Sequence, residues 1–380
     1  MSAPRQRADV GSYDDIVAAA TRTTSLTDMG GDEHREGFEI LLDDLNSSCA
    51  GLTGVGNYFQ RSQVKSALVG RLLTQLRFNE HPEHADVKIE RPIFVLGLPR
   101  TGTTALHRLL TADPRHQGLE LWLTEYPQVR PPRQTWESDP IFSAMQEAFS
   151  QHHVANPEFM GIHYMDATSV EECWRLLRQT GKSLSYPSLA LVPNYLDWLR
   201  QQDWTDAYLR HKQNLQLIGL NDADKRWVLK NPSHLAALDA LMTAYPDALI
   251  VQTHRDPVTS IASACSLSAE ATAGHSTTFV GEGIGRSQLD MLSSSWHAFN
   301  QARPKYDAAQ FVDVDYRDFV SDPVGTTKRI YDAFDIEWTE DVDRAVTDID
   351  NESRQVGKRP SHRYDLADYG LTEGEVREAF

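Results

Sequence analysis

Residues 93–110, with the sequence IFVLGLPRTGTTALHRLL, carry the strongest structural signal in this chain. The apolar run Ile93–Leu96 predicts a strand, the glycines after it predict a tight turn, and the pattern from Ala105 onward predicts a helix. Such a turn aims backbone N–H groups and the positive end of a helix at one point, which makes an anion site. The glycine spacing is that of a P-loop, but Thr103 replaces the P-loop lysine and the positive charge lies at Arg100. We therefore expect a site for a phosphate-like group that differs from the site of an ATPase.

Length, charge and cysteine usage limit the classes of protein. The 380 residues are enough for one large or two modest domains, and 40% hydrophobic with 24% charged residues is ordinary for a soluble globular chain. The net charge of -17 argues against a general nucleic-acid or anionic-membrane surface. Cys49, Cys173 and Cys265 follow no disulfide or metal-binding spacing. With no secretory signal and no membrane-spanning run in the sequence, we expect a cytoplasmic protein without stable membrane insertion.

Runs typical of buried strands occur at four places, and a helical pattern follows each one. They cover residues 92–97, 226–230, 248–253 and 309–314. Strands that alternate with helices are typical of a parallel sheet with crossover helices. We therefore predict an α/β fold with a P-loop-like central parallel sheet flanked by helices.

The remaining segments complete the predicted organisation. Apolar residues recur at helical spacing after Phe38, so residues 1–88 are predicted to be a helical N-terminal region, with a polar and weakly patterned start. The main α/β domain is placed at residues 89–345, with an aromatic-rich helical insertion at about 115–225. Residues 346–380 are a C-terminal segment and a candidate to close over a bound nucleotide.

Polar side chains follow the predicted strands where each strand ends. Lys230 ends the second strand, Asn231 and Pro232 suit the cap and first residue of a helix, and His234 falls in its first turn. Because a helix N-terminus disfavours an imidazolium, we expect His234 to stay neutral and able to accept a proton.

The third and fourth strands end in the same manner. Arg255 follows the third strand, Asp256 is interpreted as a helix cap, and Ser260 and Ser263 share one face of the next helix. Tyr316 follows the fourth strand. Since ligands bind outside the carboxyl ends of parallel strands, these residues predict two anionic subsites beside an aromatic ring. A nucleotide with a ribose phosphate and a 5′ anhydride would satisfy all three.

The strand at 248–253 does not end in an acidic residue of the kind that holds Mg²⁺. Phosphoryl transfer normally recruits Mg²⁺ through such carboxylates. A sulfuryl group carries less negative charge, so cationic side chains alone can support its transfer. The sequence therefore favours sulfuryl transfer over kinase chemistry.

These segments resemble the sulfotransferases that use PAPS (3′-phosphoadenosine 5′-phosphosulfate), and most closely the bacterial branch with PRTGTT and KNPSHL motifs. The resemblance covers about residues 90–340. It implies that the PRTGTT loop binds the 5′-phosphosulfate, that Arg255 and Ser263 hold the 3′-phosphate, and that Tyr316 lies near the adenine. The donor-binding residues that it implies are Arg100, Thr101, Gly102, Thr103, Thr104, Arg255, Ser263 and Tyr316. For the family's C-terminal glycine-rich segment, Gly357-Lys358-Arg359 is the candidate.

The identity of the base is an open choice at this point. His234 lies four residues after Lys230, whereas animal cytosolic relatives place their histidine two residues after a lysine. Glu171, Glu172 and His163 are rival bases. Ser169–Glu172 has the pattern of a capping box, which accounts for Glu172 without chemistry.

The resemblance implies an enzyme that moves a sulfuryl group from PAPS to a hydroxyl of a small molecule and releases PAP (3′-phosphoadenosine 5′-phosphate), without a metal. The acceptor class is an alcohol, phenol, lipid or polyketide-like molecule. The catalytic candidates are His234 as the base and Lys230 with Arg100 for the charge on the leaving oxygen. A P-loop kinase that uses ATP and Mg²⁺ and a non-catalytic nucleotide-binding protein are the alternatives. No nucleic-acid partner is expected, and homo-oligomerisation stays open.

Overall fold

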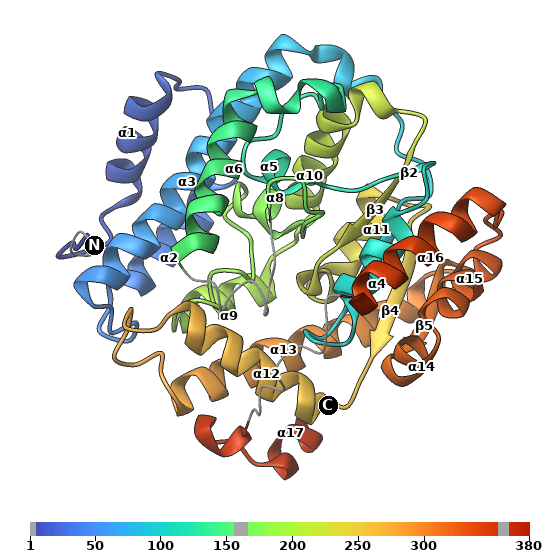
Figure 1. The fold of residues 1–380 in the computed structure, drawn as a ribbon. Coiled ribbons are helices and arrows are strands. Elements are labelled where there is room, and N and C mark those ends of the chain that lie inside the picture. Colours follow the sequence, from blue (N-terminus) through green and yellow to red (C-terminus); the bar gives the residue numbers. More distant parts are fainter. Residues whose placement is uncertain (1–4, 156–165, 356–364) are drawn as a thin grey trace.

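A single parallel sheet organises the chain, as the computed structural model shows for residues 5–155, 166–355 and 365–380. Within these residues five strands pair in the order β2-β3-β1-β4-β5, all in parallel. The strands are β1 (Ile93–Gly97), β2 (His116–Gln117), β3 (Arg226–Lys230), β4 (Leu249–His254) and β5 (Phe311–Asp315). β1 is central, so the turn after it lies between the carboxyl ends of β3 and β4 (Figure 1).

The predicted fold class is confirmed, and each of the four predicted strands lies within two residues of its observed bounds. The sequence did not predict β2, which falls inside the helical insertion. Its two residues pair with Arg226 and Trp227 at the edge of the sheet. A strand of two residues is too short to show an alternating pattern, and only its position beside β3 defines it.

Side chains of the central strand alternate between two apolar cores, because successive residues of a strand point to opposite faces. Phe94 and Leu96 pack into the larger core, and Ile93 and Val95 pack into the smaller one. The larger core includes residues of α10 (Thr205–Ile218), α11 (Leu238–Ala244), α12 (Pro257–Ala271) and α13 (Glu282–Ala302). The smaller core includes residues of α4 (Thr103–Thr111), α14 (Tyr316–Ser321), α15 (Pro323–Ala333) and α16 (Glu340–Gln355).

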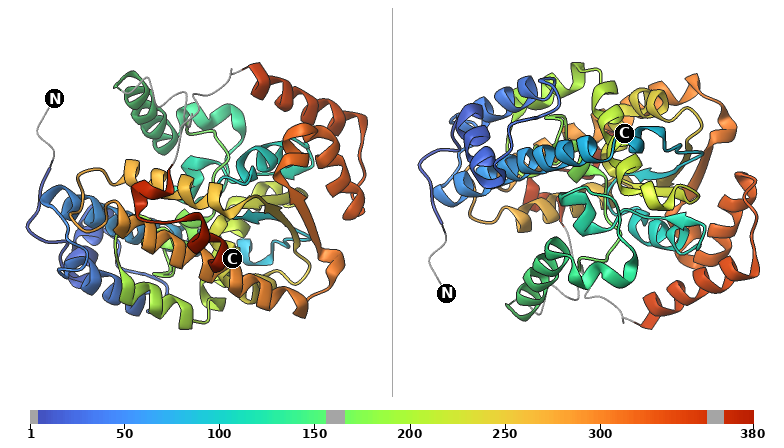
Figure 2. Two further views of the ribbon diagram at one scale, coloured as in Figure 1. Left: turned by 90° about the horizontal axis from the view of Figure 1, so that it is seen from below. Right: turned by 90° about the horizontal axis from the view of Figure 1, so that it is seen from above.

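Three N-terminal helices extend the larger core, namely α1 (Tyr13–Thr24), α2 (Arg35–Asn46) and α3 (Gly54–Glu80). The weak pattern at the start of the sequence conceals α1, whose first turn is held by a capping box between Ser12 and Asp15. Figure 2 shows these helices and α15–α16 at opposite ends of the molecule.

The region between β2 and β3 consists mainly of short helices. Several of its described aromatic residues are buried and belong to the core, namely Trp122, Trp136, Tyr186, Tyr195 and Trp204, whereas Tyr126, Trp174 and Trp198 are half-buried. Its elements are α5 (Leu121–Glu125), η2 (Arg133–Ser138), α6 (Pro140–Ala155), α8 (Trp174–Arg178), α9 (Pro193–Gln201), α10 and η3 (Leu220–Asp222).

The other short elements lie before β1, after β3, before β5 and at the C-terminal end. They are η1 (Pro82–Asp86), η4 (Pro232–Ala237), η5 (Arg303–Lys305), η6 (Ala308–Gln310), η7 (Leu366–Tyr369) and α17 (Glu373–Ala379). α17 packs against α12 and α13. Gly357–Arg359, the candidate for the glycine-rich segment, lies outside the described residues.

Candidate active site

The turn between β1 and α4 has the strand–turn–helix form that the sequence predicts. Arg100 has φ = +68°, a left-handed conformation that costs a non-glycine residue about 1–3 kcal/mol. Gly102 follows at φ = +90°, and a Cβ there would lie 3.1 Å from Phe319 and 3.3 Å from Tyr316. The backbone and the two rings therefore both favour glycine. The first N–H groups of α4 lack partners within the helix, so this turn can offer several donors to one anion.

The hydroxyl groups of the loop face different neighbours. Thr101 is buried, and its Oγ1 donates to the carbonyl oxygen of Leu98 at 2.7 Å. Thr103 is also buried. Thr104 is half-buried, and its Oγ1 accepts a hydrogen bond from Lys230 Nζ at 3.2 Å. Thr104 thus links the loop to the end of the adjacent strand β3.

Lys230 lies at the carboxyl end of β3, as predicted, and only 4% of it is exposed. Its ammonium group forms an ion pair with Glu172, whose side chain is 25% exposed. The N–H of Cys173 donates to the carbonyl oxygen of Lys230 at 3.1 Å, which holds Glu172 beside the strand. A buried ammonium group needs a partner of this kind, because an unpaired buried charge is costly.

The predicted capping box at Ser169–Glu172 does not form. α8 begins only at Trp174, and Ser169 Oγ donates instead to Asp166 Oδ1 at 3.0 Å. The carboxylate of Glu172 therefore caps no helix and pairs with Lys230. The sequence analysis set Glu172 aside as a helix cap and did not place it beside Lys230. The sequence signal that points to Glu172 is Lys230 itself, because a lysine at the end of a buried strand needs an acidic partner.

The rival base Glu171 lies next to this pair but has another role. Its Oε2 accepts a hydrogen bond from the N–H of Glu172 at 3.0 Å. His163, the other rival, lies outside the described residues.

His234 occupies the first turn of η4, after the Asn231 cap, as predicted. Its side chain is fully buried, with Nδ1 2.6 Å from the Tyr208 hydroxyl and the ring edge-on to Phe94. Burial, reinforced by His211, holds the pKa of His234 far below its ordinary value of 6.5. The predicted neutral state is therefore present, but burial causes it rather than the helix N-terminus.

The burial of His234 argues against its predicted role as the base, because protein encloses the imidazole where an acceptor would have to approach. A second histidine beside it has the same arrangement: His211 Nδ1 lies 2.8 Å from the Tyr245 hydroxyl. His211 is also fully buried, and its pKa is lowered to about 3. We call His234, Tyr208, His211 and Tyr245 the buried histidine cluster.

Arg255 directly follows β4, which flanks β1 on the side opposite β3, and it contacts the loop. Its Nη1 donates to the carbonyl oxygen of Arg100 at 2.8 Å. Its guanidinium group lies 4.0 Å from the centre of the Tyr316 ring, close enough for a cation–π contact. The structure thus brings together Arg100, Arg255 and Tyr316 at one edge of the sheet. We call Arg100, Thr104, Glu172, Lys230 and Arg255 the strand-end cluster.

The remaining predicted residues of the site lie in α12 and directly before this helix. Ser260 and Ser263 are both buried, and the described residues provide no hydrogen-bond partner for Ser260 Oγ. Asp256 precedes the helix, but its carboxylate caps none of the helix N–H groups. It forms an ion pair with Arg377 of α17 at 3.1 Å instead, so Asp256 takes the predicted N-cap position without a side-chain cap.

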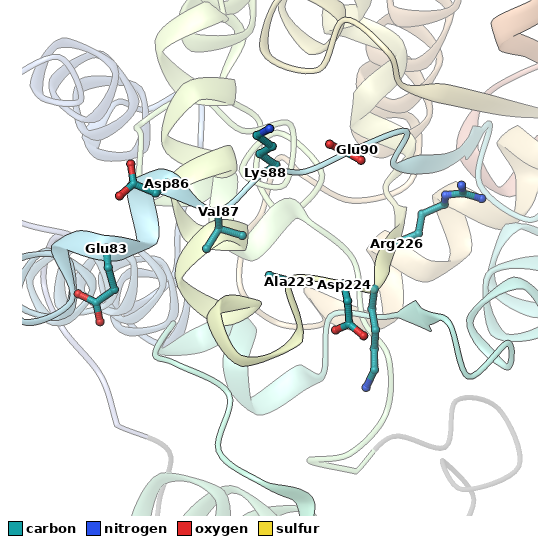
Figure 3. A pocket seen from close by; sticks show the side chains of 9 residues that line it. Glu83, Asp86, Val87, Lys88, Glu90, Ala223, Asp224 and Arg226 are labelled. Atoms are coloured by element: carbon teal, nitrogen blue, oxygen red, sulfur yellow. The ribbon is translucent and has the colours of Figure 1, made fainter.

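A cavity of about 530 Å³ lies at the opposite, amino edge of the sheet (Figure 3). Glu90, just before β1, and Lys225 and Arg226, at the start of β3, contribute to its lining. Acidic and basic side chains alternate there, so no single charge dominates. Unlike the strand-end cluster, this cavity lies away from the turn after β1 and the start of α4.

The described residues contain neither a candidate metal site nor a candidate membrane-spanning helix. No group of three or more His, Cys, Asp or Glu residues there is arranged to hold a metal ion. None of the helices described is both long and apolar enough to cross a membrane.

Residues 92–340 match the sequence profile described as the sulfotransferase family, and this span includes the whole strand-end cluster. The chain belongs to the sulfotransferase family. The match covers β1 and its loop, the insertion, and the strands and helices through α15.

Solved sulfotransferases share the fold over nearly the whole chain. The sulfotransferase STF1 from Mycobacterium tuberculosis H37Rv is 53% identical, with a TM-score of 0.91 over 98% of this chain and 99% of that one. The sulfotransferase STF9 from Mycobacterium avium is 28% identical, with a TM-score of 0.88 over 97% and 95%.

A curated relative from Mycobacterium bovis is named omega-hydroxy-beta-dihydromenaquinone-9 sulfotransferase Stf3. It is 24% identical over an alignment of 256 positions, which covers 63% of this chain. The match spans 61% of that relative's own length.

Proposed function

We propose that this protein transfers a sulfuryl group from PAPS to a hydroxyl group of a small molecule. The observation that carries the proposal is the strand-end cluster, where Lys230 and Arg255, from the ends of β3 and β4, contact the loop that leads into the N-terminus of α4. Membership of the sulfotransferase family supports it. The donor is a polyanion, and two arginines, a lysine and loop N–H groups suit such a ligand.

In this proposal the two ends of the cluster hold different parts of the donor. The loop from Arg100 to Thr104 receives the 5′-phosphosulfate, and Arg255 with Ser263 receives the 3′-phosphate. The Tyr316 ring, already packed on the Arg255 guanidinium, lies beside the adenine. Arg255 would then distinguish PAPS from ATP, which has no 3′-phosphate.

The transfer itself needs charge stabilisation on the leaving group. The acceptor oxygen attacks sulfur in line, the bond from sulfur to the bridging phosphate oxygen breaks, and its electron pair stays on PAP. Lys230 and Arg100 stabilise the negative charge that grows on that oxygen. Because these side chains supply the positive charge, the step requires no metal.

We propose Glu172 as the base that takes the acceptor proton. Its carboxylate reaches the strand-end cluster and is partly exposed, whereas His234 is enclosed and Glu171 bonds to a backbone N–H. Lys230 holds the Glu172 carboxylate in an ion pair. A bound phosphosulfate competes for the same ammonium group, so donor binding would release Glu172 to act on the acceptor.

The acceptor is assigned only as a hydroxylated small molecule. The name of the Stf3 relative gives a hydroxylated menaquinone, which favours a lipid-like alcohol among the candidates for this chain. The buried aromatic residues of the insertion give no independent support, because they form core.

The test is the release of PAP from PAPS in the presence of a panel of alcohols, phenols and isoprenoid alcohols. We expect release that depends on one acceptor class and persists with a metal chelator. Tight PAP binding without release for any acceptor would favour the non-catalytic alternative. Phosphoryl transfer from ATP that requires Mg²⁺ would favour the kinase.

A further inference from the structure

A chain of buried hydroxyl groups runs beneath the donor loop. Thr253, near the end of β4, is 2% exposed, and Thr101 is 1% exposed. Their Oγ1 atoms lie 2.5 Å apart. Thr253 Oγ1 also lies 3.2 Å from the carbonyl oxygen of Leu96, and Thr101 Oγ1 lies 2.7 Å from that of Leu98. Two side chains thus connect the end of β4 with both sides of the turn.

The number of available protons decides which hydroxyl group donates in each of these hydrogen bonds. Each hydroxyl has one proton to donate, but the two oxygens make three short contacts. The contact from Thr101 to Leu98 is the shorter of the two carbonyl contacts, so it takes the Thr101 proton. The Thr253 proton then serves the contact between the two hydroxyls. Thr253 therefore donates to Thr101, and Thr101 donates to the carbonyl oxygen of Leu98. Leu98 lies two residues before Arg100.

The loop needs this support because its backbone is strained. Arg100 has φ = +68°, and such a conformation persists only where its surroundings determine it. Gly97 pairs with Thr253 in the sheet, and a Cβ on Gly97 would lie 2.6 Å from the Thr253 carbonyl oxygen. The backbone of β1 therefore approaches closely where the hydroxyl chain passes. Arg255 adds a second tie, through the Arg100 carbonyl, from the same strand end.

We propose that Thr253 is a positioning residue that holds the donor loop in its anion-binding conformation before the donor arrives. Thr253 is too deeply buried to touch the donor, and it acts through Thr101 and Leu98. The loop then keeps its N–H groups aligned without an energetic cost at the moment of binding. This inference rests on the proposed function, since the ligand it serves is the donor.

The test compares Thr253→Val with Thr253→Ser. Valine has the shape of threonine but replaces the hydroxyl with a methyl group, which cannot approach Thr101 Oγ1 as closely. We expect PAP to bind the valine variant about five- to tenfold more weakly, the scale of one lost hydrogen bond and the displacement it causes. The serine variant keeps the hydroxyl and should bind PAP like the wild type.

Thr124→Val is the matched control. Thr124 is fully buried, and its Oγ1 donates to the Leu121 carbonyl three residues back, as Thr101 does to Leu98. We expect a lower melting temperature but unchanged PAP affinity in this variant. If Thr253→Val does not fold, Thr253→Ala removes the same hydroxyl and should weaken binding to a similar extent.

Two results would overturn the inference: wild-type PAP affinity in Thr253→Val, or equal weakening in Thr253→Ser. Amide hydrogen exchange of residues 98–104 without ligand gives a readout that does not depend on the donor. We expect faster exchange in Thr253→Val and not in Thr253→Ser, and equal rates in both would contradict the role of Thr253. If the wild type binds no PAP, the proposed function fails while the exchange comparison still decides this inference.

Discussion

Lys230 of the strand-end cluster and His234 of the buried histidine cluster lie four residues apart in the sequence, yet their partners differ in exposure to solvent. Lys230 ends β3 and pairs with the partly exposed Glu172. His234 turns into the core and bonds to Tyr208 with no exposed surface. Lys230 and His234 both belong to the KNPSHL motif. A motif therefore does not show which of its polar residues can reach a ligand. In this motif Lys230 pairs with a partly exposed carboxylate, whereas His234 has no exposed surface.

Replacement of the Glu172 carboxylate should have the largest effect. We expect Glu172→Gln to lower kcat by about 10²–10⁴-fold, the usual range for loss of a general base. PAP affinity should be retained, because Lys230 is then no longer engaged by a carboxylate. Steady-state PAP release and calorimetry measure the two quantities. Glu171→Gln is the control, and a loss of turnover there with none in Glu172→Gln would reverse the assignment.

Arg100→Ala should rank next. We expect turnover to fall by about 10²–10³-fold, the scale for loss of a preorganised charge-stabilising donor. Lys225→Ala at the amino edge removes the same charge beside the cavity there and should leave turnover unchanged. Unchanged turnover in Arg100→Ala would remove Arg100 from the donor loop.

Arg255→Ala should affect recognition more than the chemical step. One lost charged hydrogen bond corresponds to about 10–100-fold in affinity. We expect the variant to lose most of its preference for PAP over adenosine 5′-phosphate, measured by calorimetry with both nucleotides. Arg317→Ala, a neighbouring exposed arginine, should keep that preference. A variant of Arg255 that still prefers PAP would assign the 3′-phosphate to other residues.

The buried histidine cluster should influence stability rather than turnover. His234→Gln is expected to cost about 1–3 kcal/mol of unfolding free energy, because the Tyr208 hydroxyl loses its buried partner. Its effect on kcat should be far smaller than that of Glu172→Gln. Urea unfolding and PAP release distinguish these outcomes. A loss of turnover with full stability would restore His234 as the base.

The same cluster predicts a direction for the pH dependence of stability. The pKa of His234 is far below 6.5 in the folded protein, and that of His211 is about 3. The unfolded chain then binds more protons below pH 6.5, so the stability from neutral burial is present above that pH and is lost as pH falls. Urea unfolding at pH 7 and pH 5 measures the loss, which should be smaller in His234→Gln. An equal loss of stability in the wild type and in His234→Gln would contradict this contribution of His234.

The smallest effect is expected at the contact between α17 and the start of α12. Arg377 and Asp256 form a largely exposed ion pair, and such pairs contribute about 0–1 kcal/mol. Arg377→Ala should therefore change PAP affinity by less than about fivefold. A larger change would mean that α17 positions Arg255 more strongly than this single contact suggests.

Sequence reasoning recovered the features that repeat or that need special residues. The strands showed as apolar runs, and the turn at Gly97–Gly102 needs glycine because of its left-handed backbone. It failed where a role depends on packing between distant segments. Glu172 resembled a helix cap, and only its position beside Lys230, 58 residues away, shows its partner. The burial of the His234 imidazole is likewise not visible in a short motif.

The most direct test of the central claim is calorimetric titration of the wild-type protein with PAP and with ATP, each with and without Mg²⁺. The strand-end cluster, with Arg255 beside the loop, predicts that PAP binds tightly without metal and that ATP binds far more weakly. Binding of ATP with Mg²⁺, together with no measurable binding of PAP, would contradict the account.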